Sequence, residues 1–195
     1  MGTFEQGYMG GFRGKLGTAV GSTWKGLNVL RSRPPRKRTG PASESQLEVQ
    51  AKFSLMIKFL QPLTDLLNRT FKKSAGNMSG ANKAFSENKK AVAGAYPAFT
   101  IDYPKVILST SSLGNGGGPI AKSAEAGKLV FTWTDNSNDV KKMLISDLAF
   151  VAAYNEELNS WAYEPKAATR NAGTFTLDVA EFSGKPVQTY IGFIQ

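Results

Sequence analysis

The spacing of the apolar residues changes once along this chain, and that change limits the fold more than any other feature. Between residues 43 and 73 the apolar residues recur at steps of three and four, which is typical of an amphipathic helix. Pro62 lies inside this stretch and predicts a kink or a break near Gln61. The apolar stripe consists of Val49, Phe53, Met56, Leu60, Leu63, Leu67 and Phe71.

The start of this helix carries a capping box, formed either by Ser43 with Gln46 or by Ser45 with Glu48. A second helix is predicted over Asn82–Ala95, where small and apolar residues gather on one side. The stripe of the first helix has two interpretations. It packs against a sheet as core, or it forms a seam between copies of the chain.

After Pro97 the pattern becomes that of short strands separated by turn residues, which indicates an antiparallel sandwich or a partial barrel. The glycines of Gly114–Pro119 predict a flexible turn or hinge. The expected strands are Phe99–Tyr103, Lys105–Thr110, Lys128–Thr134, Ser146–Tyr154, Ser160–Glu164, Thr174–Val179 and Pro186–Ile194.

The first 42 residues are rich in glycine and allow two interpretations. Glycines at spacings of three and four fit a helix with a small-residue face, but each interior glycine costs a helix about 1 kcal/mol relative to alanine. The alternative is a pair of strands, Thr18–Trp24 and Leu27–Ser32, that turn at Lys25-Gly26. We favour the strands, followed by a linker or laid-down arm at 31–41, where Pro34-Pro35 enforces an extended path.

These patterns predict an α+β chain with three parts. An extended, Gly-rich, basic N-terminal arm or hairpin occupies residues 1–42, and a kinked helix pair occupies residues 43–97. An antiparallel β-sandwich of the immunoglobulin-like or FN3-like type occupies residues 98–195.

Charge is divided unevenly along the 195 residues, which carry a net charge of +9. Residues 1–105 hold 17 basic and 6 acidic residues, whereas residues 106–195 hold 7 basic and 9 acidic ones. The first part is therefore expected to meet something anionic, which is nucleic acid, another acidic surface or the mildly acidic second half of a neighbouring copy.

The chain contains no cysteine and no histidine. This composition excludes disulfides, thiolate nucleophiles, catalytic triads built on histidine, and metal sites with Cys or His ligands. We therefore expect no enzyme, no cofactor and no metal. No apolar run reaches the length of a membrane span, and residues 1–26 do not read as a secretory signal. The default expectation is a cytoplasmic protein, with a virion or an assembled extracellular particle left open.

Several segments are similar to one known family and follow its order through nearly the whole chain. They are GGFRGKLGTAVGSTWKG, RSRP, KFLQPL, AVAGAYPAFTIDY, LVFTWTDNS, the strand at 147–154, ATRNAGTFTLDV and VQTYIGF. Together they resemble a family of small Bacteroidota proteins, domain of unknown function 6266. The resemblance implies no activity, cofactor or catalytic residue. Family members usually continue past the GFI stretch into one more strand, so the end at Gln195 implies an exposed sheet edge that the front of the chain, or of a neighbour, fills.

Taken together, these features predict a non-enzymatic structural protein that assembles with copies of itself into a homo-oligomer or polymer, through its N-terminal arm and a sheet edge. The alternative is a nucleic-acid-binding packaging, nucleoid or virion-associated protein that uses the same basic segment. The residues expected to carry either role are Arg13, Lys15, Trp24, Lys25, Arg31, Arg33, Arg36, Lys37 and Arg38.

Overall fold

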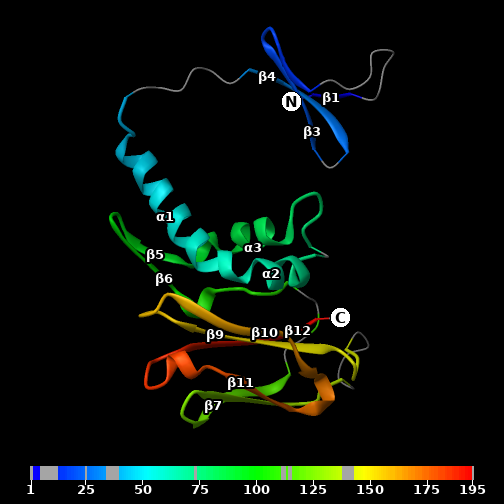
Figure 1. Ribbon diagram of the computed structural model, residues 1–195, viewed down its shortest axis with the longest axis vertical. Helices are drawn as coiled ribbons and strands as arrows, with labels where there is room; N and C mark the ends of the chain where they lie inside the picture. The colour runs from blue at the N-terminus through cyan, green and yellow to red at the C-terminus, as the bar shows by residue number, and fades with distance from the viewer. Residues whose placement is uncertain are drawn as a thin grey trace. The chain divides into compact units, whose positions relative to one another are not determined.

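The protein consists of two compact units, residues 1–42 and residues 43–195, which we call the front unit and the body (Figure 1). The predicted division between 43–97 and 98–195 falls inside the body. The computed structural model describes residues 2–4, 13–24, 26–33, 40–72, 74–110, 113, 116–137 and 143–194.

The front unit is a four-stranded antiparallel sheet, which we call the front sheet, with strand order β1-β4-β3-β2. Its two central strands are the strand pair that we expected, so the extended interpretation of the glycine-rich segment is confirmed over this hairpin. Gly26 adopts a positive φ of 81° in the turn between them, a conformation that favours glycine. The strands are β1 (Gly2–Phe4), β2 (Gly14–Leu16), β3 (Ala19–Trp24) and β4 (Leu27–Ser32).

The body begins with the expected helix, which starts at the capping box of Ser43 and Gln46. Pro62 breaks it as predicted, because proline lacks the N–H that an α-helix needs and instead occupies a short 3₁₀ turn. The resulting elements are α1 (Glu44–Leu60), η1 (Gln61–Leu63) and α2 (Thr64–Thr70).

The second helix is shorter than the sequence suggested. It forms α3 (Gly80–Asn88), passes through the 3₁₀ turn η2 (Lys89–Ala91), and then gives way to the hairpin β5 (Val92–Ala95) and β6 (Ala98–Ile101). The prediction of a helix to Ala95 was wrong because Gly94 has a φ of 89° and lies against the backbone of Ala98, which suits a tight hairpin.

Two further predictions, one of a strand and one of a turn, need correction. Lys105–Thr110 is not a strand, since Pro104 places Tyr103–Lys105 in the 3₁₀ turn η3 and the chain then runs without regular structure. Gly117–Pro119 belongs to a strand rather than to a flexible turn, while Gly114 lies outside the described residues. Packing explains the neighbouring glycine, because a Cβ on Gly116 would lie 2.8 Å from the Cβ of Trp133.

Two three-stranded antiparallel sheets complete the body. One has the order β10-β9-β12 and the other has the order β11-β8-β7. The strands are β7 (Gly117–Glu125), β8 (Lys128–Thr134), β9 (Leu148–Asn155), β10 (Ser160–Thr169), β11 (Thr174–Asp178) and β12 (Gln188–Ile194). Short 3₁₀ turns, η4 (Arg170–Ala172) and η5 (Ala180–Phe182), follow β10 and β11.

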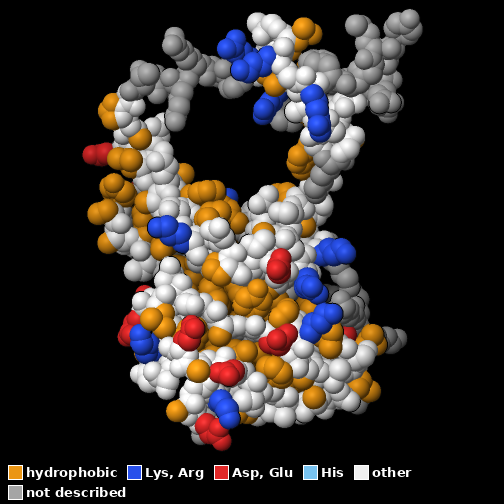
Figure 2. Space-filling view, viewed as in Figure 1, with side chains coloured by type: hydrophobic (Ala, Val, Ile, Leu, Met, Phe, Trp, Pro, Cys, Tyr) orange, Lys and Arg blue, Asp and Glu red, His pale blue; other side chains and the backbone are white. Residues whose placement is uncertain are grey.

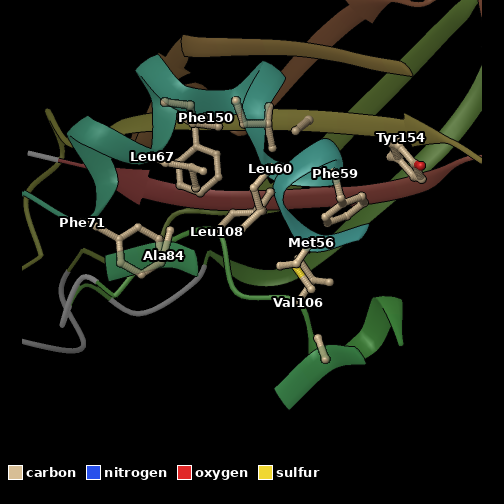
Figure 3. Packing of buried hydrophobic residues seen from close by; sticks show 14 residues of the cluster. Met56, Phe59, Leu60, Leu67, Phe71, Ala84, Val106, Leu108, Phe150 and Tyr154 are labelled. Atoms are coloured by element: carbon tan, nitrogen blue, oxygen red, sulfur yellow. The ribbon is translucent and has the colours of Figure 1, made fainter. Parts of the chain in front are cut away.

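The body is built in three layers, with the β10-β9-β12 sheet in the middle (Figure 1). One face of this sheet packs against the helices, where Phe59 and Leu67 lie close to Phe150 and Tyr154 of β9 (Figure 3). The other face packs against Leu129, Phe131 and Trp133 of β8 and against Leu177 of β11. Helices and antiparallel sheets thus share one structure, and the α+β class is confirmed.

Candidate assembly surfaces

The front sheet presents two faces, and the strand register decides which side chains share each one. Lys15, Val20 and Arg31 are directly opposite one another on β2, β3 and β4, so they form one row across the sheet. Since alternate residues of a strand point to the same face, Trp24 and Leu27 share the face of this row. One face therefore combines two cations at one end with two apolar side chains at the other.

The predicted basic residues do not all lie on that face. Arg13 donates a hydrogen bond from Nε to Oγ1 of Thr23 at 3.3 Å, and Thr23 belongs to the opposite face. Arg33 follows β4 as an exposed side chain. The remaining predicted residues, Lys25, Arg36, Lys37 and Arg38, lie outside the described residues, as does most of the expected linker.

The front sheet has little core of its own. Among its described residues, Val29 is the one large apolar side chain that is buried, whereas Leu16, Trp24 and Leu27 are 67%, 49% and 54% exposed. Leu30, which shares the opposite face with Leu16, is exposed as well. The unit therefore offers apolar side chains on both faces and carries almost no acidic residue to balance its cations.

A groove of about 380 Å³ runs along the outer side of β12, at the edge of the middle sheet. Its floor and walls come from β12 residues 189–193, from Phe150 on β9, and from residues 106–109 and 113. Val106 and Leu108 belong to the core on the helix side of the sheet, so this irregular segment overhangs the edge strand.

Asn88 at the end of α3 fixes the overhanging segment. Its side chain is fully buried, accepts a hydrogen bond from the N–H of Ile107 at 2.7 Å, and donates to the carbonyl oxygen of Ile107 at 2.8 Å. The amide also donates to the carbonyl of Ala84 at 2.9 Å. The backbone of Ile107 is thus satisfied by the helix instead of by β12.

Tyrosines and carboxylates gather at the end of the groove where β12 begins. The Tyr190 hydroxyl donates to the carbonyl of Tyr103 at 3.2 Å. Burial raises the pKa of Tyr103 above its ordinary value, and the neighbouring Glu156 adds to that shift by charge and hydrogen bonding. Burial likewise raises the pKa of Tyr190, with a smaller contribution from Tyr154. These tyrosines therefore stay neutral beside the carboxylate of Glu156, while the next carboxylate, Glu157, pairs with Lys185 at 3.4 Å.

The stripe of α1 is core over only part of its length. Its C-terminal half is buried, whereas Val49 and Phe53 are 67% and 52% exposed. Figure 2 shows hydrophobic side chains on the molecular surface over α1. Phe53 packs edge-on against Phe85 of α3 with ring centres 4.7 Å apart, beside an apolar hollow of about 170 Å³. Lys52 pairs with Glu48 at 2.7 Å at its margin. The interpretation as core is therefore confirmed for the second half of the stripe, whereas the first half is an exposed surface, for which a seam between copies stays a prediction.

The sequence analysis missed a buried ion pair that joins the ends of β9 and β10. Arg170 and Asp147 are both buried, with Nε and Oδ2 3.5 Å apart. Arg170 also donates from Nη1 to Asn136 at 2.6 Å and stacks over the ring of Phe193 at 3.9 Å. Nothing in the local sequence marked these two residues, because a single arginine in a turn is usually exposed.

The described residues hold no group of three Asp or Glu side chains placed to bind a metal ion. Among the helices that the structure describes, none combines the length and apolar character needed to cross a lipid bilayer.

The two units together define an α+β protein in which a small basic sheet precedes a helix-covered pair of sheets. The chain belongs to the family of unknown function DUF6266, whose model matches residues 11–195. This confirms the family resemblance seen in the sequence. No curated protein and no solved structure matches this chain.

Proposed function

We propose that this protein is a non-enzymatic structural protein whose copies assemble into a homo-oligomer or polymer, with the front unit acting as the connecting arm. The observation that carries the proposal is the exposure of Leu16, Trp24, Leu27 and Leu30 on a sheet that buries little else. The lack of histidine and cysteine in the sequence excludes imidazole and thiol catalysis, which supports a non-enzymatic role.

The size of the front unit makes a docking partner necessary. A unit of about 40 residues buries too little apolar surface to fold unaided, and such units usually depend on disulfides, metals or association. Disulfides are excluded because the chain has no cysteine, and Glu5 is the one carboxylate side chain in residues 1–42. Association with another surface remains as the source of stability, and the mildly acidic second half of a neighbouring copy has the complementary charge.

The test is light scattering of the full chain after size-exclusion chromatography over a wide concentration range. We expect a concentration-dependent mass above that of one chain. Leu27→Asp with Leu30→Asp, one change on each face of the front sheet, should shift the equilibrium to the monomer. The matched control, Leu144→Asp with Leu158→Asp, places the same charges at exposed leucines of the body and should leave the mass unchanged. A monomer at every concentration of the unaltered protein refutes the proposal.

Nucleic-acid binding is a second candidate, favoured by the row of Lys15, Val20 and Arg31 on the face that also carries Trp24. Lys15 and Arg31 are two strand spacings apart, about 10 Å, which suits contacts to separate phosphates. A gel-shift assay with salt titration tests it. Lys15→Glu with Arg31→Glu should abolish binding, while Lys122→Glu with Lys166→Glu, two exposed lysines of the body, should not. Absence of a shift for the unaltered protein at low salt removes this candidate.

The finer fold assignment is also part of the proposal. The two packed antiparallel sheets of the body support an immunoglobulin-like or FN3-like sandwich, a framework on which edge strands commonly serve as assembly surfaces.

A further inference from the structure

In the described part of the chain the middle sheet of the body ends at β12, and no strand lies beside the outer side of residues 189–192. In the strand order, β12 has β9 as its neighbour on one side and no strand on the other among the described residues. Within the same part of the chain, no backbone hydrogen bond joins residues 189–192 to residues 106–108. A strand with free N–H and C=O groups is a template for another strand.

The overhanging segment, residues 106–109, forms a groove together with this edge of β12. Asn88 binds both backbone groups of Ile107, which keeps the segment from closing onto β12. The space left between them is the groove of about 380 Å³, with Leu108, Leu113 and Phe150 among its lining residues. An added strand would therefore gain backbone hydrogen bonds from β12 and a place for one apolar side chain beside them.

The front sheet supplies a strand with the matching properties. β2 is the last strand of that sheet in the described part of the chain, and no described strand pairs with its outer side. Leu16 is the most exposed large apolar residue of the front sheet. Arg13 and Lys15 flank it with positive charge, and Glu156 and Glu157 directly follow β9 at the end where β12 begins. The donor is basic, and Glu156 supplies a carboxylate at the acceptor end, where Glu157 is already paired with Lys185 at 3.4 Å.

We propose that β2 of one copy adds to the outer edge of β12 of a second copy, with Leu16 entering the groove beneath residues 106–109. This inference rests on the proposed self-assembly and names its acceptor. Donor and acceptor are different surfaces, so the contact is heterologous and generates a ring if the rotation closes and a filament if it does not.

The cysteine-free chain allows a direct test by cross-linking. Leu16→Cys and Thr189→Cys are made separately, mixed as full-length proteins and treated with a short bismaleimide, which tolerates a shift of a residue or so in register. We expect a cross-linked dimer from the mixture and little from either protein alone. Thr176→Cys on β11, an exposed threonine on an edge strand of the other sheet, replaces Thr189→Cys in the control mixture and should give no dimer.

Substitutions at the two strands provide a second measurement. Leu16→Asp and Thr189→Lys should each weaken association at least about tenfold, because a charge in the groove or on the edge opposes strand addition. Ile120→Asp and Thr176→Lys, matched changes at exposed positions of the other sheet, should change it less than about twofold.

The outcomes separate this inference from the proposed function. Oligomers without a Leu16→Cys to Thr189→Cys cross-link leave self-assembly standing and overturn the strand addition. A third protein carries Leu16→Cys and Thr189→Cys in the same chain. If a cross-link forms only within this chain and the mass is that of a monomer, both the strand addition and the proposed self-assembly are overturned, since the front unit then docks on its own body. A monomeric mass with no cross-link overturns both as well.

Discussion

The front sheet and the middle sheet of the body are both antiparallel, yet their central strands differ sharply in burial. Seven consecutive residues of β9, Ala149–Asn155, are buried, because helices cover one face of its sheet and a second sheet covers the other. In β3, Gly21 is the one buried residue. The comparison teaches that strand pairing alone does not make a core. Stability is therefore expected to reside in the body, and the capacity to associate in the front sheet.

Removing the buried ion pair should give the largest contrast between the two units. Arg170→Ala leaves Asp147 charged and buried without its partner, which should lower the free energy of unfolding of the body by about 3–5 kcal/mol. Arg31→Ala on the exposed front sheet should change it by less than about 0.5 kcal/mol. Urea unfolding followed by circular dichroism measures both. Equal effects of the two changes would contradict the comparison.

Replacing one leucine in each unit by alanine tests the same difference in stability between the body and the front sheet. Leu66 on α2 is fully buried, so Leu66→Ala should cost about 2–5 kcal/mol through lost burial and a residual cavity. Leu30→Ala on β4 removes a partly exposed side chain and should leave the unfolding midpoint of the body unchanged. The check is urea unfolding of both variants beside the unaltered chain. A large loss for Leu30→Ala would mean that the front sheet contributes to the core after all.

The parts of the fold that depend on local chemistry could be predicted from the sequence. The capping box at Ser43, the break at Pro62 and the hairpin around Gly26 were all predicted, since each depends on residues within a few positions. The end of α3 was misjudged because Ala91 and Val92 fit a helical pattern, while the hairpin that follows depends on contacts between β5 and β6. Strand β7 was missed because the glycines at its start resemble a flexible turn, whereas Gly116 and Gly117 lie against Trp133 and Thr134 of β8, which are distant in sequence.

The candidate site was predictable to a similar extent. Basic residues of the front could be named from charge alone, but their division between two faces required the register of β2, β3 and β4. An exposed sheet edge stays a prediction, and the last place of β12 in the described strand order and the overhang held by Asn88 depend on tertiary packing. The burial of Arg170 had no sequence signal, because its partner Asp147 lies 23 positions away in sequence.

A smaller effect is expected from the residue that holds the groove open. Asn88→Ala leaves the N–H and C=O of Ile107 without their partner, which should cost the body about 1–3 kcal/mol. Asn82→Ala, at an exposed position of the same helix, is the control and should be nearly neutral. Hydrogen exchange at Ile107 reports the cause, since its amide should lose protection in Asn88→Ala alone. Unchanged protection of the Ile107 amide would show that the position of the overhanging segment does not depend on the Asn88 side chain.

The smallest effect concerns Tyr190, and it should reverse with pH. At pH 7, Tyr190→Phe removes the hydrogen bond to Tyr103 and should cost about 1 kcal/mol. Burial raises the pKa of Tyr190 in the folded state, so above pH 10 the unfolded chain loses this proton while the folded chain keeps it.

The stability that comes from a neutral Tyr190 is thus fully present below pH 10 and is lost as the pH rises beyond it. Tyr190→Phe cannot lose that proton, and its stability should fall less steeply than that of the unaltered chain between pH 10 and about 11. Urea unfolding at a series of pH values measures both slopes, with Tyr96→Phe at an exposed position as the control. Parallel slopes would mean that Tyr190 ionises as readily in the folded protein as in the unfolded chain, and that the tyrosine end of the groove is open to water.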